Sequence, residues 1–218
     1  MGDILTITTE TGRRPSGETP SDHVWAALSS VRISGGVLCS YRASLVDDGL
    51  LEAVRTIFTA RSGLPADWLD GVTPFEWIEL EHFKTLVVSF ADVTGLEQMR
   101  AITRRRMTDS EHSNFYAPVL RSWIRSFGDS VEHTLRCVVP LWRSALRNAG
   151  VPDVELVAPG EIHLVMTGPL ARVLYSSEAM AAAFEGILLG ILDLPRPRPL
   201  VDVQFSYKPD ESVTVCKF

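Results

Sequence analysis

The sequence predicts an α+β fold in which N-terminal helices are followed by an antiparallel sheet built as hairpin, helix and hairpin. Before Gly150, apolar residues recur mostly at helical spacing, whereas after it they mostly alternate with polar residues, as in strands. Pro159-Gly160 and Lys208-Pro209-Asp210 interrupt the alternating segments, which is typical of two hairpins. Helices first and an antiparallel sheet last are the pattern of an α+β domain.

The length and composition indicate a single α+β domain over 21–218, preceded by a mobile tail over 1–20. The chain has 218 residues, of which 45% are hydrophobic, and this suffices for a sizeable core. The first twenty residues lack both periodicity and an apolar leader segment. The longest apolar run, Ala179–Leu192, is too short to span a bilayer and contains Glu185, so we expect no membrane span.

Charge and cysteine content narrow the class of protein. A net charge of −6 argues against nucleic-acid binding, which needs a basic surface. The basic run Arg104–Arg106 is therefore expected to be a solvated face near the end of a helix. The three cysteines are too widely spaced for a disulfide framework or a metal-ligand pair, which favours a reducing, cytoplasmic location. An excess of arginine over lysine suggests a bacterial source.

The N-terminal half is predicted to contain one strand and a series of helices. Loose alternation predicts the strand within Val31–Ala43. Thr73-Pro74-Phe75-Glu76 predicts a helix start, because a capping threonine, a first-turn proline and a reciprocal glutamate follow one another. Further helices are expected after Asp48 and over Leu80–Val93, Leu96–Met107, Tyr116–Phe127 and Ser130–Asn148.

The C-terminal half is predicted to place the helix Glu178–Leu192 between the two hairpins. The strands are expected over Val154–Val157, Glu161–Thr167, Leu200–Tyr207 and Val213–Phe218. Within the helix, Ala182, Gly186 and Gly190 form a ridge of small residues at intervals of four. Such a ridge lets another backbone approach closely, so we expect this helix to lie tightly on the sheet or on a second protomer.

No sequence motif of a known catalytic or metal site is present. Glu79 and His82 could share a helix face as an acid–base pair, although a solvated acidic face is the simpler interpretation. His133 lies opposite the apolar stripe of its helix by the 100° per residue rule, so we expect it to be exposed. We therefore predict no metal ligands, no cofactor and no enzyme activity.

Aromatic residues supply the candidates for a ligand pocket. Bulky apolar rings can form the wall of an apolar ligand site, although they also pack ordinary cores. The candidates are Trp123, Phe127, Trp142, Tyr175 and Phe184.

Short segments along 30–218 resemble an uncharacterised family of myxobacterial domains. These segments are Val31-Arg32-Ile33, Val37–Arg42, Trp77–Phe83, Val139–Trp142, Glu155–Val157, Gly160-Glu161, Phe184–Gly186 and Val213–Phe218. The order of elements is also similar to a wider fold group that contains TRAPP tethering subunits, 4-vinyl-reductase-type domains and haem nitric-oxide-binding (H-NOX) domains. The resemblance implies a non-catalytic sensor or scaffold, often dimeric, with an apolar cavity.

The resemblance also bears on haem. Haem sensors of this group carry a Tyr-x-Ser-x-Arg motif for the haem propionates, and Tyr175-Ser176-Ser177-Glu178-Ala179 occupies its place here. Ala179 stands where the arginine is expected, and a propionate needs a cation. Together with the outward direction of His133, this predicts that the protein binds no haem.

The leading hypothesis is a regulatory signalling module that binds a partner protein or a small apolar ligand. A homodimer is expected as well, because Trp25, Val37 and Tyr41 look like exposed apolar material. The alternative is a haem or gas sensor of the H-NOX type. A second alternative is an unrecognised enzyme that uses Glu79 and His82.

Overall fold

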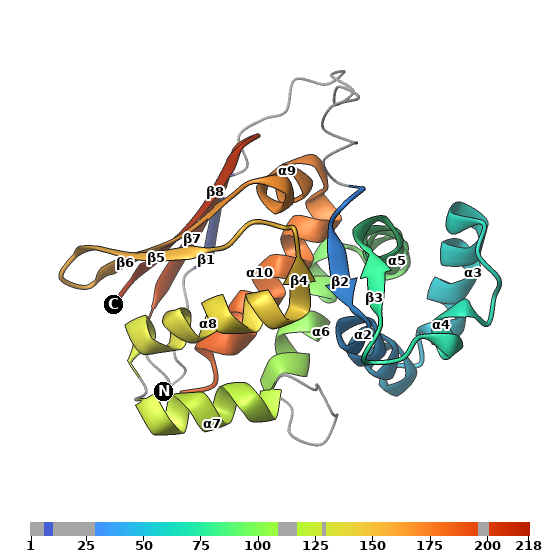
Figure 1. The fold of residues 1–218 in the computed structure, drawn as a ribbon, viewed down its shortest axis with the longest axis horizontal. Helices are drawn as coiled ribbons and strands as arrows, with labels where there is room; N and C mark the ends of the chain where they lie inside the picture. Colours follow the sequence, from blue (N-terminus) through green and yellow to red (C-terminus); the bar gives the residue numbers. More distant parts are fainter. Residues whose placement is uncertain (1–6, 11–28, 109–116, 128–129, 196–200) are drawn as a thin grey trace.

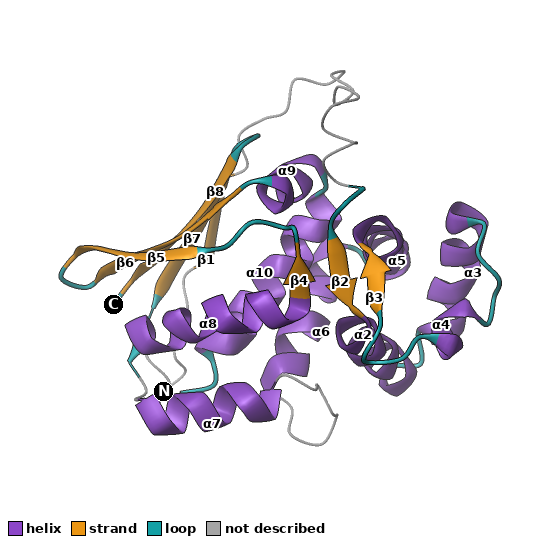
Figure 2. Cartoon of the chain, viewed as in Figure 1, coloured by secondary structure: helices purple, strands orange, loops and turns teal. Residues whose placement is uncertain are grey.

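A computed structural model describes residues 7–10, 29–108, 117–127, 130–195 and 201–218, and it confirms the predicted α+β class. Helices fill the N-terminal part of the described chain, and an antiparallel hairpin–helix–hairpin arrangement follows (Figure 1). Figure 2 shows that the strands gather into one long sheet and one short sheet, with helices between and beside them.

The N-terminal part alternates short strands with helices. Its elements are β2 (Arg32–Ser34), α2 (Gly35–Asp47), α3 (Leu51–Ser62), α4 (Trp68–Gly71), β3 (Trp77–Glu79), α5 (Leu80–Thr94), α6 (Leu96–Thr108), α7 (Ala117–Phe127), α8 (Val131–Ala145) and β4 (Leu146–Arg147). The helices expected over 80–93, 96–107, 116–127 and 130–148 are therefore present with slightly different ends. The helix over 130–148 is shorter than expected, because its last residues form β4.

The strand expected within Val31–Ala43 is only three residues long, and most of that segment is the helix α2. The Ser34 side chain accepts a hydrogen bond from the Gly36 backbone N–H at 3.2 Å and so caps the helix. Leu38, Tyr41 and Leu45 are buried at helical spacing. The loose alternation of apolar residues in this segment was therefore part of a helical pattern, and it did not indicate a longer strand.

The segment Thr73–Glu76 was wrongly expected to start a helix. The reciprocal contact does form, because the Thr73 backbone N–H donates to the Glu76 carboxylate. The chain then enters β3 rather than a helix, and α5 begins only at Leu80. Pairing with β2 explains the difference, since Ile78 lies opposite Ile33 in an antiparallel ladder.

A three-stranded sheet in the order β3-β2-β4 joins distant parts of the chain. The central strand β2 pairs with β3 on one side and with β4 on the other, so Arg32 lies between Glu79 and Arg147. The short sheet thereby holds α2, α5 and α8 around a common centre.

The C-terminal part forms a five-stranded sheet in the order β1-β7-β8-β6-β5. Its elements are β5 (Asp153–Ala158), β6 (Glu161–Thr167), α9 (Pro169–Ser176), α10 (Glu178–Leu192), β7 (Asp202–Tyr207) and β8 (Glu211–Lys217). Both expected hairpins and the helix between them are confirmed, whereas α9 was not predicted. The strand β1 (Ile7–Glu10) lies within the expected tail and pairs in parallel with β7, while 1–6 and 11–20 lie outside the described residues.

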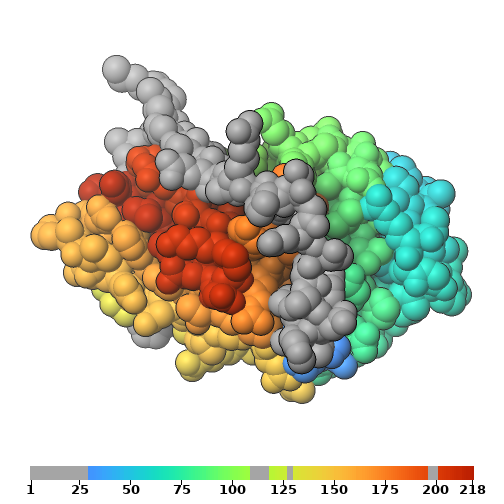
Figure 3. Space-filling model, turned by 90° about the horizontal axis from the view of Figure 1, so that it is seen from above, coloured from blue at the N-terminus to red at the C-terminus, as the bar shows by residue number. Residues whose placement is uncertain are grey.

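Helix α10 runs through the middle of the molecule, with the long sheet on one side and α2 to α5 on the other (Figure 1). The surface seen from above carries the C-terminal strands, in red, on one side and the cyan and green helices of the N-terminal part on the other (Figure 3). Nearly all of its side chains are buried. Among the described residues no single helix is both long and apolar enough to cross a membrane. The consecutive helices α9 and α10 meet that criterion only together, and they are bent by 112°.

The ridge of small residues on α10 faces α6, not the sheet or a second protomer as expected. A Cβ atom added to Gly186 would lie 2.6 Å from the Arg100 carbonyl oxygen, and one added to Gly190 would lie 2.6 Å from the Arg104 carbonyl oxygen. Two ion pairs flank this contact, from Arg100 to Glu185 and from Arg104 to Asp193, both at 2.6 Å. The two helices are therefore held together by close backbone packing and by charge.

Gly186→Ala tests this packing, because the new methyl group would collide with the α6 backbone. Alanine normally stabilises a helix relative to glycine by about 1 kcal/mol. A loss of stability in this variant would therefore show that the methyl group collides with α6. We expect the free energy of unfolding to fall by about 1–3 kcal/mol in urea titrations. The control is Gly71→Ala, since a Cβ there meets nothing within 4 Å. Equal stability of the two variants would contradict the close contact.

Candidate functional site

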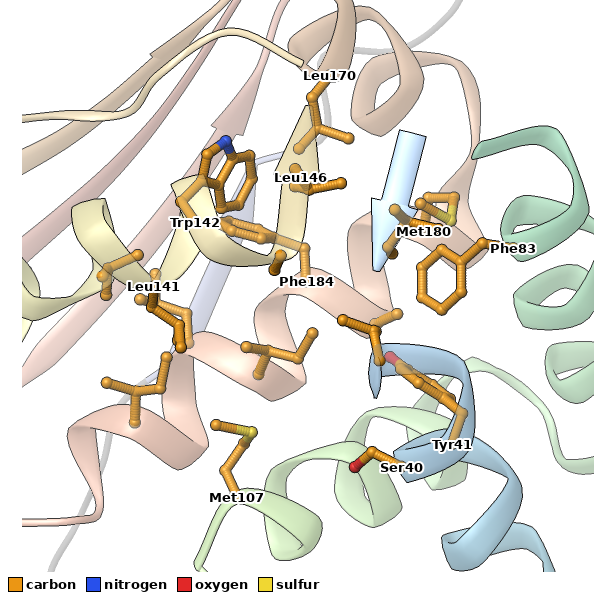
Figure 4. A pocket seen from close by; sticks show the side chains of 18 of the residues that line it. Ser40, Tyr41, Phe83, Met107, Leu141, Trp142, Leu146, Leu170, Met180 and Phe184 are labelled. Carbon is orange, nitrogen blue, oxygen red and sulfur yellow. The ribbon is translucent and has the colours of Figure 1, made fainter. Parts of the chain in front are cut away.

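A cavity of about 120 Å³ lies where the N-terminal helices meet α8, α9 and α10 (Figure 4). Its walls come from both halves of the chain. The lining residues are Ile33, Val37, Ser40, Tyr41, Leu80, Phe83, Arg106, Met107, Val138, Leu141, Trp142, Ala145, Leu146, Leu170, Leu174, Met180, Ala183, Phe184, Ile187, Leu188 and Ile191.

The cavity is almost entirely apolar, and its size matches a compact ligand. Apart from Ser40, Tyr41, Arg106 and Trp142, every lining side chain is aliphatic, a phenyl ring or a thioether. A cavity of about 150 Å³ with such walls stays dry and accepts benzene, whereas drug-sized ligands occupy roughly 300–1,000 Å³. In its present form the cavity therefore suits a molecule about the size of benzene.

Two of the five predicted pocket residues line the cavity. Trp142 and Phe184 meet edge to face, with ring centroids 6.1 Å apart (Figure 4). The Trp142 indole N–H donates to the Gly150 carbonyl oxygen at 3.2 Å, which fixes the ring at the wall. Trp123 and Tyr175 are half-buried against the core and do not line the cavity. The Phe127 side chain lies outside the described part of the chain.

Arg106 places a buried cation at the wall of this cavity. The residue is only 6% exposed, and its guanidinium carbon lies 3.8 Å above the centre of the Tyr41 ring. The Nε and Nη1 atoms of Arg106 have no hydrogen-bond partner within the described structure. Burial lowers the pKa of Arg106 below its ordinary value because the guanidinium has left water, although Tyr41 opposes this effect.

The expectation that the arginine run is a solvated face is wrong for two of its three members. Arg104 forms two hydrogen bonds with the Asp193 carboxylate, and Arg106 is buried. Arg105 fits the expectation best, because its side chain is 60% exposed and pairs with Asp48. The signal was present in the sequence, since Met99, Ile102, Thr103, Arg106 and Met107 follow helical spacing and form the buried face of α6.

The acid–base pair that Glu79 and His82 offered as an alternative to a solvated acidic face is absent among the contacts of the described residues. Glu79 lies just before α5 and forms an ion pair with Arg32 at 3.3 Å. The His82 ring packs against Trp68, with centroids 5.3 Å apart. Each residue therefore has a structural role, and the second alternative, an enzyme built on this pair, loses its basis.

Among the described residues, the histidines and cysteines do not form a metal site. His133 is exposed, as expected, and its Nδ1 lies 2.8 Å from the Ser130 hydroxyl. Within the described ranges no group of three histidine, cysteine or acidic residues could hold a metal ion. In the segment compared with the haem motif, Ser177 caps α10 through the Met180 backbone N–H, and Ala179 is buried.

Known structures share this fold. No protein-family model and no curated protein matches the sequence. A solved H-NOX protein from S. oneidensis in the Fe(II)NO ligation state is 12% identical, with a TM-score of 0.57, over 85% of this chain and 98% of that chain. A variant of the T. tengcongensis H-NOX is 16% identical, with a TM-score of 0.54, over 85% and 97% of the two chains. A structure whose title concerns haem redox potential and protein-induced porphyrin distortion is 15% identical, with a TM-score of 0.52, over 85% of this chain and 100% of that chain.

The chain thus has an H-NOX-like fold. At these identities the comparison shows the fold alone, so the resemblance to H-NOX domains is confirmed at that level. The resemblance to myxobacterial domains, and the grouping with TRAPP subunits and 4-vinyl-reductase-type domains, stays a prediction.

Replacing Arg106 tests whether its charge is uncompensated. Arg106→Met keeps a long apolar stem and a sulfur atom against Tyr41 but removes the buried charge. We expect the free energy of unfolding to rise by about 1–3 kcal/mol, because an unpaired buried charge is costly. Arg105→Met is the matched control and should change stability by less than about 1 kcal/mol. A clear loss of stability in Arg106→Met, measured by urea unfolding, would show that the cation has partners in the folded protein.

Proposed function

We propose that this protein is a non-enzymatic sensor domain whose cavity binds a small apolar molecule. The observation that carries the proposal is the cavity itself, with apolar walls supplied by α2, α5, α6, α8, α9 and α10. A ligand there would contact both halves of the chain at once, which suits a domain that reports on ligand binding. We keep a bacterial cytoplasm as its proposed location.

The fold comparison favours the alternative hypothesis, a haem or gas sensor of the H-NOX type, over the leading hypothesis of a partner- or ligand-binding module. The neighbours' titles name haem, porphyrin distortion and an Fe(II)NO state. These titles support the proposal of a sensor. Whether haem is the ligand depends on whether the residues around the cavity can hold it.

The residues around this cavity do not fit haem. Haem iron in proteins is most often held by a histidine or a cysteine thiolate, and neither residue type lines the cavity. His133, on the same helix as the wall residues Val138 and Leu141, is exposed and bonded to Ser130. His82, next to Phe83 in the sequence, does not line the cavity and packs against Trp68. The cavity is also smaller than drug-sized pockets. We therefore propose a compact apolar ligand in preference to haem, and haem remains the second candidate because of the fold.

The cavity predicts binding of benzene. Saturating benzene should raise the melting temperature of the protein, because a ligand that binds only the folded state stabilises it. Ala183→Leu should weaken this shift at least several-fold, since Ala183 lines the cavity and leucine would fill part of it. Ala101→Leu makes the same change at an exposed position of α6 and should leave the shift intact. No shift in the unmodified protein would refute the proposed function.

Reconstitution with hemin separates the two candidates. We expect no intense Soret band in the absorption spectrum after excess hemin is removed. A strong band abolished by His133→Ala would restore the H-NOX-type gas sensor. A band that survives this substitution would indicate adsorption to apolar surface.

The dimer hypothesis loses two of the three residues that motivated it. Tyr41 is buried, and both Val37 and Tyr41 line the cavity, so neither contributes an exposed apolar patch. Trp25 lies outside the described residues. Binding of a partner protein, a role in signalling and homodimer formation therefore stay proposals, to be tested by light scattering and by co-purification.

A further inference from the structure

We propose that the ligand is a small apolar monocarboxylate whose carboxylate pairs with Arg106 while its apolar body fills the cavity. This inference rests on the proposed function, since it names the chemical class of ligand for the same cavity. It follows from one cation, two hydroxyl groups and the apolar walls around them.

The charge of Arg106 is the first step in the argument. Three other arginines of α6 have carboxylate partners: Arg100 pairs with Glu185, Arg104 with Asp193, and Arg105 with Asp48. Arg106, the most buried of them, has no such ion pair within the described residues, and no acidic residue lines the cavity. A buried charge without a counter-ion is costly, so an anionic ligand would relieve that cost when it binds.

The orientation of the guanidinium is the second step. Its carbon lies 3.8 Å above the Tyr41 ring centre, so the ring occupies the flat face of the group. Arginine N–H groups lie in the plane of the guanidinium, so stacking on the ring does not occupy them, and their fork matches a carboxylate in a bidentate arrangement. Tyr41 is itself held by Phe83, edge to face at 5.2 Å. The cation is thus positioned before any ligand arrives.

Two hydroxyl groups of the same wall are the third step. The side-chain oxygens of Ser40 and Tyr41 are buried and have no hydrogen-bond partner within the described structure. Both residues line the cavity together with Arg106 (Figure 4 shows the two hydroxyl-bearing side chains). Buried polar groups are normally paired, so three residues of this wall with unpaired donors favour an acceptor in the cavity.

Size and charge then select the class of anion. A single arginine matches the single negative charge of a carboxylate, whereas a phosphate monoester carries about −1.5 to −2 near pH 7. The cavity of about 120 Å³ admits an apolar body about the size of a benzene ring or a short alkyl chain. Benzoate combines both features and is a suitable probe.

The experiment compares benzoate with benzene at pH 7 and constant ionic strength, by calorimetry and by the shift in melting temperature. We expect benzoate to bind the unmodified protein about tenfold more tightly than benzene or better, because hydrogen bonds to charged groups are the strong ones. Arg106→Met should weaken benzoate binding at least about tenfold, and by a far larger factor than it changes benzene binding. Arg105→Met, the matched control, should bind both probes as the unmodified protein does.

Each other outcome is informative. Benzene binding without preferred benzoate binding, or benzoate binding that Arg106→Met leaves intact, overturns the carboxylate assignment and leaves the proposed function standing. Binding of neither probe overturns both. If Arg106→Met does not fold, the comparison of the two probes on the unmodified protein still decides the question, and Arg106→Lys, which keeps the charge without the planar fork, should give an intermediate loss of benzoate binding.

Discussion

The close packing of α6 on α10 is the constraint on which the rest of the structure depends. Gly186 and Gly190 let the α6 backbone come within contact distance of α10, where any side chain would collide. Arginines four residues apart on α6 then reach Glu185 on α10 and Asp193, the residue that follows its last turn. Glu185 also accepts a hydrogen bond from the Tyr207 hydroxyl at 3.1 Å, which ties the same helix to β7. This helix is therefore a main link between the two halves of the chain.

This arrangement also decides where the cavity lies. Because α6 is held against α10, its last turn brings Arg106 and Met107 to the place where α2 and α8 approach from other sides. Burial raises the pKa of Glu185, although Arg100 and Tyr207 oppose the effect, so the charged pairs beside the cavity are costly to bury. Several buried charges therefore lie around a site whose walls are otherwise apolar.

Strongly periodic segments were predictable from the sequence, and segments whose structure depends on distant partners were not. The helix Glu178–Leu192 has a serine cap and a continuous apolar sequence, and both hairpins carry clear turn residues. By contrast, Trp77–Glu79 is a strand only because β2 lies beside it, and nothing local indicates that pairing. The helix α9 is only eight residues long and is separated from β6 by one residue, and no element was predicted over its residues.

The candidate site was predictable in its aromatic part and not in its polar part. Trp142 and Phe184 were identified as bulky apolar residues, and both line the cavity. Arg106 was missed because a run of three arginines suggests solvent exposure, whereas only the helical spacing distinguishes the buried member from its neighbours. The orphan hydroxyl groups of Ser40 and Tyr41 could not be found either, since that segment was taken for a strand.

The parallel pairing of β1 with β7 has a consequence for the order of folding. Ile7 lies opposite Val203, so this edge of the sheet closes a loop that contains almost the entire described chain. The conformational entropy lost on closing a loop grows with its length, and contacts between distant residues form slowly. The hairpin β7–β8, whose partners are adjacent in sequence, must provide the template onto which β1 is added late. A nascent chain emerging from the ribosome would therefore keep this sheet edge open until its last strands had been synthesised.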